Sequence, residues 1–343
     1  MFSQRLLEWH DKNARDLPWR GEKDPYRIWV SEIMLQQTTA QTVKGYYARF
    51  LEAFPTVRAL AEADEERVLK LWEGLGYYSR ARNLMKAAQI AARDMGGRLP
   101  GDAAALKRLP GVGDYTAAAI ASMAYGQPEV AMDGNLVRVL ARVTAEQGCV
   151  GEAAVKRRLR AAGEALIDRD RPGDFNQAMM GLGNLVCVPG RPRCGARPVA
   201  DYCRAHEMGC AGDLLHMPPN LDKHKERRGV AIVLCGERVL VRRRPENALL
   251  GGLWEYPNFE NAVDAASLLE CLEEMGVQAR FVKRLGTANH VFTHKIWQMT
   301  AFLFSAESLP NESDLRGAAP DELARLPMPT AMTRLNRLRE GGA

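Results

Sequence analysis

The sequence predicts two domains, an all-α N-terminal domain and a smaller α+β domain that follows it. Three observations carry this prediction. The chain has 343 residues, more than the roughly 250–300 residues at which a single hydrophobic core stops growing. From about residue 2 to residue 186, apolar residues recur three and four positions apart, as they do on one face of a helix. After Gly229 they follow the spacing of strands.

Composition excludes several classes of protein. Hydrophobic residues make up 46% of the chain and charged residues 26%, which is the balance of ordinary soluble domains and not that of disordered, collagen-like or coiled-coil chains. No apolar run reaches the ~18 residues of a transmembrane helix, and the first residues lack the apolar run of a secretory signal. We therefore expect a cytoplasmic protein without a membrane partner. The net charge of +5 permits a polyanionic partner.

The helical domain is assigned to residues 1–186. Apolar positions in Ile28–Leu35, Val68–Trp72 and Leu136–Leu140 have helical spacing. Glycine and proline, as at Gly96-Gly97, mark the ends of helices.

The second domain is assigned to residues 229–343. Val230–Cys235, a Gly-Glu turn and Arg238–Arg242 predict a β-hairpin. Ala265–Met275 predicts a helix, and Phe292–Phe304 contains further strand-like runs. These elements predict an α+β fold.

Between the two domains lies a segment rich in cysteine. Four of the seven cysteines fall within 24 residues: Cys187, Cys194, Cys203 and Cys210. Clustered cysteines in a reducing compartment indicate metal or iron–sulfur ligation rather than disulfides. We assign residues 187–210 to a cysteine-rich loop, and residues 211–228, which end in a charged run, to a linker.

The segment Leu109-Pro110-Gly111-Val112-Gly113 stands directly before a helix of small residues. Its glycines let the backbone approach a ligand closely, and the start of a helix offers free N–H groups and the positive end of a dipole. This pattern favours a helix-hairpin-helix motif, which holds a DNA backbone without reading the bases. An ordinary corner between two helices is the alternative.

Two acids have informative surroundings. Glu32 lies in an apolar helical segment, and Asp133 directly precedes another apolar helix. Separately, Asp133 is explained as a helix N-cap and Glu32 as a partly exposed charge. Together they match the pair that cleaves a glycosidic bond, in which one acid donates a proton and the other stabilises an oxocarbenium-like sugar.

With these motifs in place, the chain resembles the MutY family of adenine DNA glycosylases, within the helix-hairpin-helix DNA glycosylase superfamily. The matching segments are Leu17–Arg20, Val30–Thr38, Gly74–Leu84, Leu109–Gly113, Met132–Asn135 and Phe175–Met180. The resemblance implies a helix-hairpin-helix glycosylase domain with an iron–sulfur-type loop, followed by a Nudix-like domain. It also implies a bacterial, nucleoid-associated monomer that acts on double-stranded DNA and removes adenine mispaired with 8-oxoguanine or guanine.

The resemblance assigns roles to the acids and their neighbours. Glu32 would protonate N7 of adenine, Asp133 would stabilise the sugar cation, and Tyr115 and Asn135 would orient the two carboxyl groups. Glu32 must then be protonated at neutral pH, which burial can achieve. The related endonuclease III branch has a nucleophilic lysine where this chain has Tyr115. The chain is therefore expected to be a monofunctional glycosylase.

Further residues would handle the base outside the duplex. A stacked base must be extruded before it can react. The resemblance places Arg20 near the flipped adenine, and it places Gln37 and Tyr77 in the gap that the base leaves. The alternatives are that Tyr77 belongs to the core and that Gln37 caps a helix.

The family holds a 4Fe–4S cluster with the pattern C-x6-C-x2-C-x5-C. Cys187, Cys194 and Cys203 match three of its positions, whereas Arg197 stands at the third position, where a guanidinium has no lone pair to offer. The resemblance implies a cluster on the three cysteines. Cys210, seven residues beyond Cys203, is a candidate for the fourth ligand, and His206 is a weaker candidate. A loop that no longer binds a full cluster is the alternative.

The second domain contains a degenerate Nudix box in Gly251–Pro257 and Leu269–Val277. Leu269 stands where the box has arginine, which disfavours metal-dependent pyrophosphate hydrolysis. Phe292-Thr293-His294 matches the family loop that senses 8-oxoguanine, and a plain hairpin turn is the alternative.

Two other functions are left open. An endonuclease III-like pyrimidine glycosylase and AP lyase is disfavoured by Tyr115 and by the extra domain. A non-catalytic damage-binding protein is disfavoured because both acids are retained.

Overall fold

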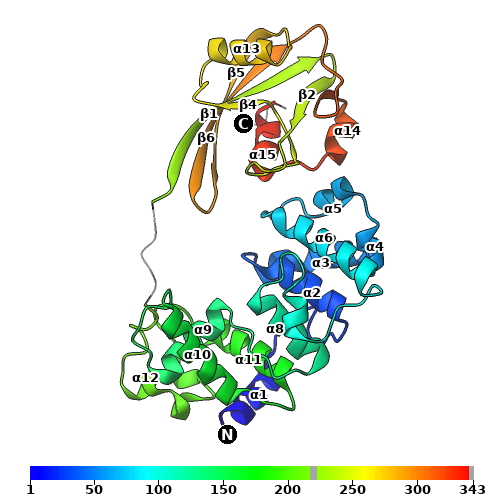
Figure 1. Ribbon diagram of the computed structural model, residues 1–343. Helices are drawn as coiled ribbons and strands as arrows, with labels where there is room; N and C mark the ends of the chain where they lie inside the picture. Colours follow the sequence, from blue (N-terminus) through cyan, green and yellow to red (C-terminus); the bar gives the residue numbers. More distant parts are fainter. Residues whose placement is uncertain (217–221, 340–343) are drawn as a thin grey trace. The chain divides into compact units, whose positions relative to one another are not determined.

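The computed structural model describes residues 1–216 and 222–339, and the chain divides into two compact units (Figure 1). The first unit comprises Met1–Ala63 and Arg82–Pro219, and the second comprises Asp64–Ala81 and Asn220–Ala343. A short stretch of the helical region thus groups with the C-terminal part. In the described residues, no helix is long and apolar enough to cross a membrane.

The first unit is helical, which confirms the predicted all-α region. Its α-helices are α1 (Phe2–Asn13), α2 (Pro25–Leu35), α3 (Ala40–Ala53), α4 (Val57–Ala61), most of α6 (Ser79–Asp94), α7 (Ala103–Leu106), α8 (Asp114–Tyr125), α9 (Gly134–Thr144), α10 (Ala153–Leu166), α11 (Pro172–Leu185) and α12 (Arg204–Glu207). Two 3-10 helices, η1 (Cys194–Ala196) and η2 (Ala200–Tyr202), lie in the cysteine loop.

Small residues let the helices of the first unit approach one another closely. α8 packs against α2 and α11, and its segment 117–121 is entirely buried. A Cβ atom on Gly173 of α11 would lie 2.7 Å from the backbone of α8, and one on Gly183 would lie 2.7 Å from the Cβ of Asn135. Glycine is therefore required at both positions, and α11 is held against α8 and α9.

The second unit is built on a mixed sheet with the strand order β3-β2-β1-β6-β5, in which β4 pairs with β1 and β7 pairs with β2. Its strands are β1 (His224–Cys235), β2 (Arg238–Arg243), β3 (Trp254–Glu255), β4 (Asn258–Glu260), β5 (Arg280–Val291), β6 (Lys295–Ser305) and β7 (Leu315–Ala318). Its helices are α5 (Glu65–Leu71), α13 (Ala265–Glu274), α14 (Pro320–Arg325) and α15 (Thr330–Arg339). This confirms the predicted α+β fold.

Helices cover both faces of this sheet (Figure 1). Along β1, Val230 and Ile232 share one core with α14 and α15, whereas Ala231 and Val233 share the other core with α13. A strand that is buried on both faces reads as a continuous apolar run, which is why the sequence showed this strand so clearly.

Two elements differ from the sequence-based expectation. The charged run expected in the linker 211–228 is the beginning of β1, which pairs in parallel with β6 from His224 onward. Its glutamate is partnered, because Glu226 accepts hydrogen bonds from Lys295 and Trp297. Residues 217–221 of that linker lie outside the described part. β5 was not expected, because most of its side chains are exposed and show no apolar alternation.

Candidate active site and cysteine loop

A cavity of about 360 Å³ in the first unit brings together five residues that the sequence singled out. Its walls include Arg20, Glu32, Tyr115, Asp133 and Asn135. These residues come from α2, α8, the start of α9 and the loop before α2. The fold thus assembles both acids and their expected positioning residues in one hollow.

Glu32 is buried in the apolar helix α2, where its side chain is only 5% exposed. Burial raises the pKa of Glu32 to about 7, and the negative charge of Asp133 adds to this rise. The hydroxyl of Tyr115 donates a hydrogen bond to Oε2 of Glu32, which opposes the rise in pKa. The carboxyl group therefore titrates near neutrality, as a general acid in this position requires.

Asp133 is both a helix N-cap and a wall of the cavity. It accepts a hydrogen bond from the backbone N–H of Leu136 and another from Nδ2 of Asn135, each at 2.7 Å. Burial raises the pKa of Asp133, while these two hydrogen bonds lower it. The N-cap explanation from the sequence was thus correct, and it does not compete with a site role, because the helix dipole favours the ionised carboxylate.

Arg20 lies between polar partners at the edge of the cavity. Its Nη1 donates a hydrogen bond to Oε1 of Gln177 and lies 3.3 Å from Nε2 of His10. Within the described residues, its Nε is buried without a hydrogen-bond partner. A buried donor without a partner costs free energy unless a ligand accepts from it.

Four residues of α11 also line the cavity, although the sequence motifs assigned them no role: Gln177, Met180, Gly181 and Asn184. They are three, four and seven positions apart and share one helix face. Gln177 and Met180 lie in the matching segment Phe175–Met180, and extending their helical spacing beyond that segment was the signal that could have identified all four.

Gln37 and Tyr77 both have backbone conformations that are rare for residues with a side chain. Their φ angles are 58° and 49°, and such left-handed conformations cluster at functional positions. Gln37 is exposed and is not part of the cavity wall. Tyr77 is 45% exposed, whereas Tyr78 is 4% exposed, so Tyr78 rather than Tyr77 belongs to the core.

The turn that joins β5 and β6 holds Phe292, Thr293 and His294. Phe292 packs edge-on against Trp297, with ring centroids 4.9 Å apart, while Thr293 and His294 are exposed. Within the second unit, the hydroxyl groups of Thr293 and Tyr77 lie 2.9 Å apart and share a hydrogen bond. The structure therefore joins two residues that belong to separate sequence motifs.

The glycine hairpin leads into α8 as the sequence predicted. Gly111 has a φ of 75°, and a Cβ there would lie 2.7 Å from the Cβ of Asn83. Val112 is buried, and Gly113 is the N-cap of α8 with no side chain capping the helix. The first backbone N–H groups of α8 are therefore not capped by a side chain, which suits a phosphate.

The cysteine loop does not fit a 4Fe–4S cluster. Cys187 and Cys203 are buried, and the guanidinium of Arg197 donates hydrogen bonds to both of their sulfur atoms. Cys194 and Cys210 are partly buried beside Cys203. A cluster on both cysteines needs the space beside their sulfur atoms that the guanidinium fills, so the predicted cluster on these cysteines disagrees with the donor set of the folded loop.

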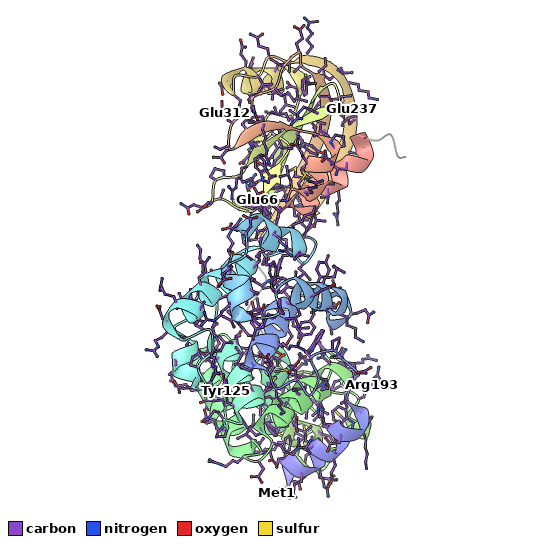
Figure 2. The ribbon with its side chains drawn as sticks, turned by 90° about the vertical axis from the view of Figure 1, so that its right-hand side faces the viewer. Met1, Glu66, Tyr125, Arg193, Glu237 and Glu312 are labelled. Atoms are coloured by element: carbon purple, nitrogen blue, oxygen red, sulfur yellow. The ribbon has the colours of Figure 1, made fainter. Side chains whose placement is uncertain are left out.

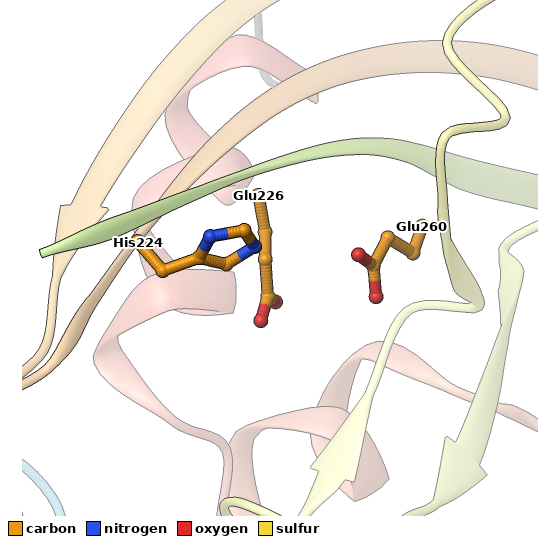
Figure 3. Close-up of side chains that lie close together, drawn as sticks. All are labelled: His224, Glu226 and Glu260. Atoms are coloured by element: carbon orange, nitrogen blue, oxygen red, sulfur yellow. The ribbon is translucent and has the colours of Figure 1, made fainter.

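In the second unit, His224, Glu226 and Glu260 lie close together (Figure 3), with one ligand atom of each within 4.8 Å of the others. Glu226 already forms ion pairs with Lys295 and Arg228. Cations in direct contact with the central carboxylate disfavour a bound metal ion, and the group is better described as an ion-pair network that ties β1 to β6. Among the described residues, the glutamates of the degenerate Nudix box form no comparable group.

Comparison with known proteins agrees with the two units. A model of the HhH-GPD superfamily of base excision DNA repair proteins matches residues 30–164, and a model of the NUDIX domain matches residues 229–338. The adenine DNA glycosylase of Mus musculus is 34% identical, over 99% of this chain and 78% of its own length. The chain belongs to the adenine DNA glycosylase family. It is thus a base excision repair enzyme that hydrolyses an N-glycosidic bond.

Other relatives support this adenine DNA glycosylase assignment. The adenine DNA glycosylase of Buchnera aphidicola subsp. Acyrthosiphon pisum is 38% identical, over 88% of this chain and 86% of its own. Among solved structures, a thermostable thymine-DNA glycosylase is 30% identical with a TM-score of 0.56, covering 60% of this chain and 95% of its own. An endonuclease III–DNA complex, 22% identical with a TM-score of 0.51, covers 60% of this chain and 94% of its own and shares the fold alone. The pyrimidine glycosylase and the non-catalytic alternatives are set aside.

Proposed function

We propose that this enzyme removes adenine paired with 8-oxoguanine, or with guanine, from double-stranded DNA and leaves an intact strand with an abasic site. The observation that carries the proposal is the cavity in which Glu32, with a pKa of about 7, faces the same space as Asp133. Two carboxyl groups with separate environments are what glycosidic cleavage needs.

Glu32 is the proton donor in this proposal. Because Tyr115 donates to Oε2 of Glu32, the other carboxyl oxygen is free to carry the acidic proton. That proton moves to N7 of the extruded adenine, the bond between C1′ and N9 breaks, and its electron pair leaves with the base. A protonated base is a better leaving group, and general acid catalysis of this kind contributes roughly 10²–10⁴-fold to the rate.

Asp133 stabilises the positive charge that the sugar acquires. The hydrogen bonds from Asn135 and from the backbone of Leu136 hold its carboxylate in place. Water then adds to C1′ and gives up a proton, so that the products are free adenine and an abasic sugar. Preorganised charge in a water-poor cavity acts more strongly than the same charge in bulk water.

The same cavity supports monofunctional chemistry. Within the described residues its wall contains arginine but no lysine, and Tyr115 occupies the position of the lyase amine. A phenol that donates to a carboxyl group cannot form a Schiff base. The proposal therefore includes no strand cleavage by the enzyme itself.

Recognition of the mispair is assigned to residues of the cavity wall and of the exposed surface. We assign Arg20, with its unpartnered Nε, to the extruded adenine, and the exposed Gln37 and Tyr77 to the gap in the duplex. The turn around Thr293 contributes contacts that distinguish 8-oxoguanine from guanine, because specificity needs a contact that only one partner makes. The hairpin before α8 holds a backbone phosphate.

The test is a duplex that contains one adenine:8-oxoguanine pair. We expect strand breaks only after alkali treatment, and no efficient covalent adduct when borohydride is present. Breaks that form without alkali, together with a trapped adduct that appears as fast as adenine is released, would contradict the proposal. A duplex with thymine opposite adenine is the substrate control.

A further inference from the structure

In the cysteine loop, a guanidinium lies where the family pattern has a thiolate. The side chain of Arg197 is 5% exposed. Its Nη2 donates to the sulfur of Cys187 at 2.8 Å, and its Nη1 donates to the sulfur of Cys203. Both cysteines are buried, so one side chain joins the first residue of the loop to a residue 16 positions further along.

A second arginine completes this arrangement from α9. Arg142 is 1% exposed and donates to the carbonyl oxygens of Val188 and Leu214 and, at 3.3 Å, to the sulfur of Cys187. The sulfur of Cys203 also lies 3.3 Å from the carbonyl oxygen of Arg142. Groups of the chain itself therefore contact both sulfur atoms.

The guanidinium and a cluster exclude each other because both need the same space. The guanidinium donates to the sulfur atoms of Cys187 and Cys203, so it fills the place that a cluster bound to both cysteines would need. Arginine also stays protonated in proteins and has no lone pair, so it cannot serve as the missing ligand. Its planar fork can instead reach two acceptors at once.

We propose that Arg197 takes the structural place of the iron–sulfur cluster in this chain. The loop folds around the Arg197 guanidinium without iron, and Cys187 and Cys203 act as its hydrogen-bond partners rather than as metal ligands. Cys194 and Cys210 pack beside Cys203 in a small apolar cluster and bind no metal. This proposal concerns the loop alone and stands whether or not the proposed excision reaction is correct.

The first test is the metal content of the full-length protein after anaerobic purification from iron-supplemented cells. We expect almost no iron and no visible absorbance of an iron–sulfur cluster. Iron at the level of a full cluster in the wild-type chain would overturn the proposal.

The second test restores the missing ligand. Arg197→Cys recreates the pattern C-x6-C-x2-C-x5-C and removes the competing guanidinium, so we expect this variant to gain iron and visible absorbance. Arg193→Cys adds a cysteine to the same loop outside the pattern and is the matched control. If Arg197→Cys gains no more iron than this control, the loop is not a former cluster site and the proposal fails.

The third test measures what Arg197 does in the wild-type loop. Arg197→Met keeps the length of the side chain and removes its donors, so Cys187 and Cys203 should react with an alkylating reagent about tenfold faster, because the loop opens more often. The alkylation rates in Arg197→Lys should lie between those of Arg197→Met and the wild type, since lysine keeps the positive charge and loses the planar fork of donors.

The control for this third test is Arg193→Met, which changes an exposed arginine of the same loop (Figure 2) and should leave both rates unchanged. Alkylation is read residue by residue by peptide mass analysis. Equal protection of Cys187 and Cys203 in Arg197→Met and in the wild type would show that the guanidinium does not hold the loop, and would overturn the proposal.

Discussion

The cavity around Glu32 and the cysteine loop both bury charged side chains, and they differ in what those side chains face. In the cavity, Glu32 lines an open space, with a pKa near neutrality. In the loop, Arg197 faces two sulfur atoms of its own chain. The cavity keeps both acids and both positioning residues that the family resemblance names, whereas the loop has lost one of its four expected ligands. Family roles therefore transfer residue by residue and not region by region.

The two regions are physically connected through Arg138. Its Nη2 donates to Oδ1 of Asn135 at 2.8 Å, and its Nε donates to the carbonyl oxygen of Cys187 at 2.9 Å. Asn135 in turn holds Asp133. Arg138 and Asn135 thus connect the cysteine loop to Asp133 in the cavity wall. The position of Asp133 therefore depends on a folded loop.

The largest expected effect is that of Asp133→Asn. The amide keeps the size of the side chain but cannot stabilise a sugar cation, so single-turnover excision should fall by about 10³-fold or more. Duplex affinity, measured by anisotropy, should change little. Excision within tenfold of the wild-type rate would remove Asp133 from the mechanism.

Glu32→Gln should reduce excision by about 10²–10³-fold, because the amide has no acidic proton to transfer. For the wild type, the single-turnover rate should be flat below pH 7 and should fall about tenfold per pH unit above it, since only protonated Glu32 acts. A rate that rises with pH through this range would contradict the assignment.

Tyr115→Phe should move the pH profile. The lost hydrogen bond lowers the pKa of Glu32 in the wild type, so without it the falling limb should shift upward, by about 0.5–1 pH unit. The plateau rate should drop by about tenfold because the acid is less well positioned. If the plateau rate falls but the pH of the falling limb stays the same, Tyr115 acts only through packing.

Glu32→Gln should also stabilise the protein above pH 7. The folded pKa of Glu32, about 7, lies above its ordinary value of 4.5, so the protonated carboxyl group favours the folded state. The wild type has this stabilisation in full below pH 4.5 and loses it as the pH rises through 7. At pH 8 the variant should gain about 1–3 kcal/mol in the free energy of unfolding. Denaturant titrations at pH 5 and pH 8 measure the difference, which should be small at pH 5.

The smallest expected effect concerns the second unit. Thr293→Val removes the hydroxyl that meets Tyr77, and the ratio of excision rates for 8-oxoguanine and guanine partners should narrow by about 3–10-fold, the range of one hydrogen bond. Tyr77→Phe should do the same, and the two changes should not add. Thr287→Val, on the exposed surface of β5, is the matched control and should leave the ratio unchanged.

The sequence by itself determined the order of the two folds and named most of the residues that line the cavity around Glu32. Helical and strand spacing are local properties, so α2, α8 and β1 could be identified without tertiary information. Glu32, Tyr115, Asp133 and Asn135 stand in short segments whose residue types restrict the chemistry strongly. The structure adds that one cavity contains all four residues, and their roles stay predictions.

The tertiary structure alone decided the features that depend on partners far apart in the chain. β5 and the start of β1 follow from pairing with β6, because cross-strand contacts can order segments that have little local signal. The raised pKa of Glu32 comes from burial between helices. Arg197 was visible in the sequence as a missing ligand, but its position between Cys187 and Cys203 depends on the folded loop. The sequence shows which side chain stands at a position, whereas the atoms that this side chain contacts depend on tertiary packing.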